Sequence, residues 1–496
     1  MKKFLSAIMT VVMGVTGVFS LQAGACVNGG KKDVKECPVS DYDSYPLVLI
    51  RGMDLGGLYY KLGSDEEEKA FSGINAWEIV KTVVKALTSG VYHRDLDKGI
   101  GVVIDYLNDI FGKIACNKDG SSKYDVSVPD YPLSLANYPE LWDAGDENEM
   151  GVLKTACQVL GAKNVFYYNY DWRLDPFVHA DRIDALVREA KKETGKDKVN
   201  IICYSLGGIM TDAYMYKYGH KDINRVMFMS ATFCGTYVTS DLLNGRVRVD
   251  PYALYRFADK SVGSNPLVSN ILKLIDKMGV FRAVADFANN KFIPTFIDDV
   301  YDGFLRDTFG TMPVMWALTL PEDYESAVKY TLGGHEEDYS KLIELSKEYR
   351  KMAEERESFL KAAENDGVSV IVAASYGIPC IPAYERGNSN GDGTLESPLM
   401  LGMAKVAPLG QTLGDDYEAR CPERLSPDRV VDLSDALFPE TTWAICGSPH
   451  VATSCGTDYS DFVFKILTYE GTVNVKTFDQ YPQFMLSSMK QELRKP

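Results

Sequence analysis

Short apolar runs alternate along the chain with stretches of helical spacing, and this alternation predicts the secondary structure. Apolar runs bounded by polar or glycine-rich residues, as buried parallel strands are, occur at 45–50, 164–168, 199–203, 225–230 and 368–373. Between them, the segments 179–193 and 210–218 repeat apolar residues every three or four positions, as amphipathic helices do. Strand and helix therefore alternate, and we expect an α/β fold with a mostly parallel, doubly wound sheet.

The regular alternation stops at 235–366, where segments punctuated by glycine and proline precede a charged helix predicted at 339–364. The apolar residues of that helix form one stripe, which we expect to pack on the core. We interpret 235–366 as a cap or lid inserted over the edge of the sheet where chemistry is expected, between core segments at 26–234 and 367–496. The end of the chain carries no recognisable chemistry.

A long stretch at 74–111 also has helical spacing. We interpret it as a surface helix, with an interfacial membrane helix as the alternative.

At the N-terminus, two lysines precede an apolar run at 4–21, and small residues follow at 23–25. This pattern predicts a signal peptide at 1–25 and a secreted or extracytoplasmic mature chain beginning at Cys26, with lipidation of that cysteine as the alternative. No other stretch has the eighteen or so apolar residues of a membrane span, so no transmembrane anchor is expected.

The charge balance narrows the range of partners. The 496 residues carry a formal net charge of −16, which repels phosphate backbones and anionic headgroups. We therefore expect no nucleic-acid partner and no purely electrostatic attachment to membranes. Any contact with lipid has to be apolar.

Ten cysteines occur in the chain, none in a C-x-x-C motif, and no H-E-x-x-H motif is present. Neither a metal nor another cofactor is therefore predicted. An even number of cysteines in an exported chain permits disulfides. The local pairs that we expect are Cys26 with Cys37 and Cys446 with Cys455, and the alternative is that several cysteines are free thiols in the core. We expect Cys203, beside the elbow, to be such a free thiol.

The segment 199–210 is the most informative, because a short strand delivers Ser205 into a tight turn that a helix follows. Small residues stand two positions before and after the serine, at Cys203 and Gly207. A sharp strand-to-helix bend requires small residues there, as in the nucleophile elbow. The pentapeptide alone also fits an ordinary serine at a helix N-terminus, but the strand before it and the helix after it favour the elbow.

A nucleophilic serine needs a histidine base and a carboxylate that orients the base. In α/β-hydrolases the chain order is serine, acid, histidine, and His450 is the one histidine of five that lies beyond a credible acid loop. Asp392, in a glycine-rich turn that follows the strand at 368–373, is the candidate acid. Glu396 is the fallback acid, and a plain or calcium-type loop is the alternative to a catalytic role.

The oxyanion that forms when an acyl group is attacked needs two backbone N–H donors. Leu206, directly after the serine, supplies one of them. The glycine-rich turn at 51–57 follows the first strand and supplies the other, and either Met53 or Asp54 fits this role. The sequence alone does not decide between these two residues.

Six segments and one histidine together carry a family resemblance. The segments are a strand and Leu-Gly-Gly turn at 46–62, a Tyr-Asp-Trp-Arg-Leu signature at 170–174, the elbow at 203–208, a turn at 233–236, a Ser-Tyr-Gly at 375–377 and the acid loop at 392–394. With His450, they resemble the lecithin:cholesterol acyltransferase and lysosomal phospholipase family of α/β-hydrolases. Arg51 replaces the usual proline, and the family's lid cysteine pair is absent after Gly57.

The resemblance implies an α/β-hydrolase fold and an acyl-ester lipid substrate, a phospholipid or an acylglycerol, met at a membrane or micelle surface. It also implies that Asp171 and Arg173 organise the sheet edge and the cap as a partly buried charge pair. We therefore expect an exported serine acyl hydrolase or acyltransferase that works through an acyl-enzyme on Ser205. The alternatives are an esterase or peptidase of the same fold acting on soluble substrates and a non-catalytic exported binding protein. The presence of all three triad residues argues against the binding protein.

Overall fold

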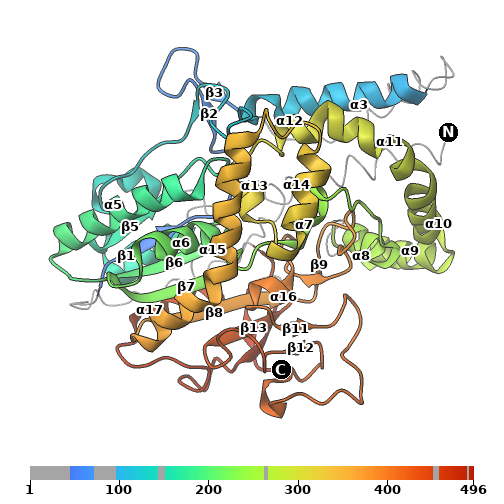
Figure 1. The fold of residues 1–496 in the computed structure, drawn as a ribbon. Helices are drawn as coiled ribbons and strands as arrows, with labels where there is room; N and C mark the ends of the chain where they lie inside the picture. The colour runs from blue at the N-terminus through green and yellow to red at the C-terminus, as the bar shows by residue number, and fades with distance from the viewer. Residues whose placement is uncertain (1–44, 72–95, 143–150, 262–265, 451–456, 489–490) are drawn as a thin grey trace.

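An eight-stranded sheet forms the centre of the computed structural model (Figure 1). The structure describes residues 45–71, 96–142, 151–261, 266–450, 457–488 and 491–496. The strand order is β15-β14-β13-β8-β7-β6-β1-β5, and all neighbouring strands are parallel except β14 and β15. The strands are β1 (Leu47–Ile50), β5 (Val165–Tyr168), β6 (Val199–Ser205), β7 (Ile223–Ala231), β8 (Ser369–Tyr376), β13 (Thr442–Cys446), β14 (Phe484–Ser487) and β15 (Leu493–Arg494). The predicted α/β fold is confirmed.

Helices cover both faces of the sheet. They are α4 (Gly151–Leu160), α5 (Pro176–Thr194), α6 (Gly207–Tyr218), α15 (Ser340–Asn365) and α17 (Asp458–Thr468). Successive side chains of a strand point to opposite faces. Val48 and Ile50 accordingly join an apolar cluster with α5, α6 and α15, whereas Leu47 and Leu49 join another with α4 and α17. Because both faces are buried, the strands are continuous apolar runs and not alternating ones.

The ends of α5 follow from local chemistry. The Asp175 carboxylate accepts a hydrogen bond of 2.8 Å from the Phe177 N–H, and Pro176 occupies the first helical position. Gly195 ends the helix at a φ of 72°, in the left-handed region that favours glycine. The helix therefore begins three residues before the predicted segment 179–193.

Besides α4, the described part of the connection from β1 to β5 forms a small three-stranded sheet and a further helix, α3. Its elements are β2 (Tyr59–Tyr60), β3 (Glu68–Lys69), α3 (Leu96–Phe111), β4 (Val126–Ser127) and 3₁₀ turns at Gly112–Ile114, Leu135–Asn137, Pro139–Leu141 and Ala162–Asn164. The helix predicted at 74–111 is thus described from residue 96 onward. The remainder of that segment lies outside the described residues.

The connection from β7 to β8 is mostly helical. It contains α7 (Tyr237–Leu243), α8 (Pro251–Ser261), α9 (Pro266–Lys277), α10 (Val280–Phe287), a π-helical turn at Ala288–Phe292, α11 (Ile293–Val300), a second π-helical turn at Tyr301–Leu305, α12 (Arg306–Thr308), α13 (Pro313–Ala317), a 3₁₀ turn at Pro321–Asp323 and α14 (Tyr324–Leu332). It ends in α15, whose stripe residues Leu342, Tyr349 and Met352 are buried, as expected for a helix packed on the core.

After β8 come short elements that position the acid loop and then the last strands. These elements are β9 (Ile378–Pro379), β10 (Asn390–Gly391), α16 (Ser397–Met400), β11 (Lys405–Val406), a 3₁₀ turn at Pro422–Arg424 and β12 (Val431–Asp432). None of the described helices combines the length and the apolar character that a membrane crossing needs.

Two predictions on the cysteines and the N-terminus fall wholly or partly outside the described residues. The predicted signal peptide at 1–25 and the cysteines 26, 37 and 455 lie there. Cys446 has a free thiol, so a disulfide from it to residue 455 is not observed. Cys203 is a buried free thiol, as predicted.

Just after β5, Asp171 and Arg173 form a buried bidentate ion pair. Arg173 Nε donates to Asp171 Oδ1 at 2.8 Å, and Nη2 donates to Oδ2 at 2.6 Å. The arginine is fully buried and also binds the Ile114 carbonyl at 3.0 Å. The pair therefore ties the end of β5 to the segment that follows α3, and its burial is nearly complete, not partial as the resemblance implies.

We expect Arg173→Ala to lower the free energy of unfolding by about 3–5 kcal/mol, because it leaves the Asp171 carboxylate buried and unpaired. The matched control is Arg188→Ala, which removes an ion pair with Asp184 from an arginine side chain that is 68% exposed. That control should cost less than about 0.5 kcal/mol. Urea unfolding followed by circular dichroism measures both variants, and equal losses would contradict the assigned role of the buried pair.

Candidate active site

Ser205 is held in a strained turn between β6 and α6. Its φ is 49°, in a region that residues other than glycine rarely adopt, and such strain is typical of functional turns. The register of β6 against β7 shifts between Tyr204 and Ser205, where the strand bends away. The predicted strand–turn–helix geometry around this serine is therefore present.

Backbone crowding explains the glycines around this turn. A Cβ at Gly207 would lie 2.7 Å from the Ile50 carbonyl oxygen, and one at Gly208 would lie 2.8 Å from the Thr232 nitrogen. A Cβ at Gly52 would lie 2.8 Å from the Cβ of Ser205 itself. The turns after β1 and β7 thus both lie in close contact with the turn that holds Ser205. Gly52 is not among the site residues predicted from the sequence, although its place in the glycine-rich turn after the first strand is a signal for it.

Asp392 and His450 are hydrogen-bonded to each other. His450 Nδ1 lies 2.6 Å from Asp392 Oδ2, and the His450 backbone N–H donates to the Asp392 carbonyl at 2.9 Å. The other carboxylate oxygen accepts N–H groups from Thr394 at 3.0 Å and Leu395 at 2.9 Å. The aspartate is fully buried, and the histidine side chain is 8% exposed. A carboxylate on Nδ1 holds the proton on that nitrogen and leaves Nε2 as the basic one.

The candidate residues follow strands of the parallel sheet at the same edge. Ser205 ends β6, Asp392 lies in the loop after β8, and His450 follows β13. The carboxyl ends of parallel strands share one edge of a sheet, where sites are usually built. Asp392 and His450, which were predicted from the order serine, acid, histidine along the chain, are thus in contact in the structure.

The candidate oxyanion donors lie next to the serine in the chain or in the turn after β1. Leu206 directly precedes α6. Met53 and Asp54 follow Gly52, and the Asp54 carboxylate forms an ion pair of 2.6 Å with Arg51, the residue that replaces the family's proline. Both Met53 and Asp54 stay predictions for the second donor.

Glu396, the fallback acid, faces another element. Its carboxylate accepts the N–H groups of Tyr237 at 3.2 Å and Val238 at 2.9 Å, and the Tyr384 hydroxyl at 2.7 Å. Burial raises the pKa of this carboxyl. Glu396 therefore binds the N-terminus of α7 and fixes the acid loop against it, while Asp392 is the carboxylate that contacts the histidine.

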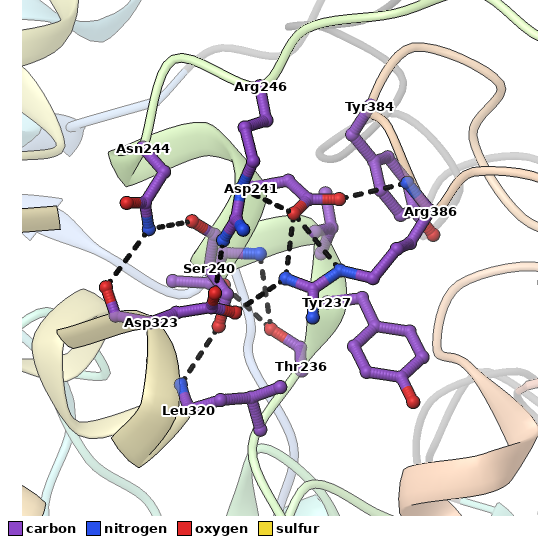
Figure 2. A network of polar contacts seen from close by, with 12 residues as sticks. Thr236, Tyr237, Ser240, Asp241, Asn244, Arg246, Leu320, Asp323, Tyr384 and Arg386 are labelled. Carbon is purple, nitrogen blue, oxygen red and sulfur yellow. Dashed lines mark hydrogen bonds and ion pairs between the residues drawn. The ribbon is translucent and has the colours of Figure 1, made fainter. Parts of the chain in front are cut away.

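A network of charged groups holds α7 in turn (Figure 2). Arg386 binds Asp241 Oδ1 through Nη2 at 2.7 Å and Asp323 Oδ2 at 2.6 Å. Arg246 lies within ion-pair distance of both aspartates, and the Arg386 guanidinium stacks 4.4 Å from the Tyr237 ring centre. Figure 2 shows these side chains converging from α7 and the segment directly after it, the 3₁₀ turn at Pro321–Asp323 and the loop after β9. The network therefore holds α7, the helix whose first N–H groups bind the Glu396 carboxylate.

The other described histidines do not share this geometry, and one of them, His335, is exposed before α15. His179 is buried between the Tyr168 hydroxyl and the Asp171 carbonyl, each 2.8 Å away, and burial lowers its pKa to about 4. His220 pairs with Asp366, but it precedes β7 and so lies at the amino edge of the sheet. Residue 93 lies outside the described residues. No group of three or more His, Cys, Asp or Glu side chains among those described is arranged to hold a metal ion.

The class of protein follows from fold and site together. A mostly parallel sheet, a serine in a strained strand-to-helix turn, and a buried aspartate–histidine pair downstream define the α/β-hydrolase fold.

Comparison with known proteins adds one partial likeness. No protein-family model matches the chain. A segment is 25% identical over 226 residues to the phospholipase A(1) LCAT3 of Arabidopsis thaliana, spanning 42% of this chain and 45% of that protein, less than half of each. The crystal structure of the Tle4–Tli4 complex contains a chain that is 11% identical to this one, and the match covers 67% of this chain and 75% of that chain with a TM-score of 0.28.

Proposed function

We propose that the protein is a serine acyl hydrolase or acyltransferase that acts on lipid esters, with Ser205 as nucleophile, His450 as base and Asp392 as the orienting acid. The observation that carries the proposal is the buried hydrogen bond between Asp392 and His450, at the sheet edge where the strained Ser205 ends β6. The partial similarity to a phospholipase A(1) supports a lipid ester as substrate.

The proposed reaction proceeds in two acyl transfers. His450 Nε2 takes the proton of the Ser205 hydroxyl as its oxygen attacks the ester carbonyl carbon. The backbone N–H of Leu206, together with that of Met53 or Asp54, binds the oxyanion that forms. The intermediate collapses, the leaving alcohol receives the proton from His450, and the acyl group remains on the serine.

The second transfer reverses these roles. His450 takes a proton from water or from an acceptor alcohol, whose oxygen attacks the acyl-serine, and then returns that proton to the Ser205 oxygen. Water gives a fatty acid, and an alcohol gives a new ester. Hydrolysis and transacylation thus differ only in the acceptor that reaches the acyl-enzyme.

The predicted cap segment 235–366 includes α15, but α15 packs on the sheet. We therefore propose that the other helices of this segment form a cap over the site, and also that the protein is exported by the segment 1–25. The cap proposal is supported by the contacts that α7 makes with the acid loop through Glu396.

Mass spectrometry of the mature N-terminus tests export, because cleavage exposes Cys26 and lipidation adds the mass of acyl chains to it.

A fluorophosphonate should label the wild-type protein on Ser205, because only an activated serine reacts rapidly with this reagent. Ser205→Ala should abolish labelling, and Ser358→Ala, at an exposed serine of α15, should leave it unchanged. Turnover of a dispersed phospholipid relative to a short-chain soluble ester then separates a lipid enzyme from a general esterase. Folded wild-type protein that takes no label would contradict the proposal.

The two buried carboxylates of the acid loop offer a matched pair of variants. Asp392→Asn should lower kcat by about 10⁴, because it deprives His450 of the charge that orients and stabilises it. Glu396→Gln should lower kcat by about tenfold or less and mainly reduce stability, since it loosens the hold on α7. Hydrolysis of a soluble ester measures both. A folded Glu396→Gln protein as inactive as Asp392→Asn would assign the acid to Glu396 instead.

A further inference from the structure

Helix α9 carries an exposed apolar stripe. Four large apolar side chains, on the helix and at its end, are 70%, 48%, 59% and 72% exposed, in the order Leu267, Ile271, Leu274 and Met278. At 3.6 residues per turn these positions fall within about 60° of one another around the helix axis. Such a continuous stripe on a surface marks a site of interaction.

The two flanks of the stripe differ in chemistry. On one side follow Val268, Leu272 and Ile275, which are half-buried, and on the other lie the exposed Lys273 and Lys277. No residue of α9 is fully buried. Only part of the apolar face of α9 therefore packs against the protein, and the exposed part has lysines along one side. This arrangement is typical of helices that lie in a membrane interface.

Local charge favours lipid over a second copy of this chain. The helices α8, α9 and α10 carry five basic and three acidic residues, whereas the whole chain has a formal net charge of −16. The basic residues are Arg256, Lys260, Lys273, Lys277 and Arg282, and the acidic ones are Asp259, Asp276 and Asp286. Lys260 faces Asp392 of the acid loop, so the exposed positive charge of this region is that of Lys273, Lys277 and Arg282. Two copies of so acidic a chain repel each other, whereas an anionic lipid surface attracts these exposed basic side chains.

The stripe is connected to the candidate active site through one helix. Figure 1 shows α8, α9 and α10 grouped at the margin of the molecule, away from the central sheet. Lys260 of α8 lies so close to Gly393, next to Asp392, that a Cβ at the glycine would overlap its Nζ atom. A lipid surface bound at α9 would thus lie one helix away from the acid loop.

We propose that the α9 stripe is the surface through which this protein docks on a lipid interface. The apolar side chains enter the headgroup region, and Lys273 and Lys277 contact anionic headgroups. The inference deepens the proposed function and rests on it for the use of docking in catalysis. Binding itself does not require Ser205, so docking and chemistry can be tested separately.

The test is flotation of the Ser205→Ala protein, which leaves the lipid intact, with vesicles of phosphatidylcholine alone or mixed with phosphatidylglycerol. Adding Leu274→Asp and Met278→Asp should weaken vesicle binding about tenfold or more. The matched control is Val178→Asp with Met403→Asp, two apolar residues that are 46% and 52% exposed elsewhere. The control should bind as the parent protein does. Lys273→Gln with Lys277→Gln should weaken binding to the anionic vesicles alone.

In the protein with Ser205 intact, Leu274→Asp with Met278→Asp should lower phospholipid turnover and spare hydrolysis of a soluble short-chain ester. No vesicle binding by the parent protein, or an equal loss in the control, would overturn the docking proposal. A dimer in sedimentation velocity that Leu274→Asp with Met278→Asp dissociates would also overturn it, by assigning the stripe to a second copy. Vesicle binding without any ester hydrolysis would instead contradict the proposed function and leave docking supported.

Discussion

The close approach of three backbone turns around Ser205 is the constraint on which the site depends. No space remains for a Cβ at Gly52, Gly207 or Gly208 without contacts of 2.7–2.8 Å, mostly to backbone atoms. The turn from β6 into α6 can therefore be sharp, and the serine is held at a positive φ at the end of its strand. Strain at this residue is maintained because the sheet and the packed helix over-determine its conformation.

The acid side of the site is built differently, by long-range polar contacts. Asp392 is fixed by two backbone N–H groups of its own loop, and the loop is fixed by Glu396 at the start of α7. Arg386 then holds α7 through Asp241 and Asp323. Helix α7, in the connection from β7 to β8, thus contacts the acid loop, so the proposed cap and the carboxylate that binds His450 are joined by one set of polar contacts.

Much of this could be predicted from sequence, because the governing signals are local. Strands buried on both faces give continuous apolar runs, so β1, β5, β6, β7 and β8 were anticipated. Chain order led to Asp392 and His450, whose hydrogen bond is observed, while their catalytic roles stay predictions. The strands β13 and β14 were not anticipated from their own residues, because strand formation depends largely on packing against the neighbouring strands. The attachment of Glu396 to α7 joins residues 158 and 159 positions apart, a separation at which no local pattern exists.

The proposed mechanism requires Ser205 to carry an acyl group during turnover. This intermediate can be trapped by quenching the wild-type protein with acid during hydrolysis of a short-chain nitrophenyl ester and locating the added mass by peptide mapping. One acyl group should be found, on the peptide that contains Ser205. Product formation with no acylated peptide, or with the acyl group on another residue, would contradict the proposed mechanism.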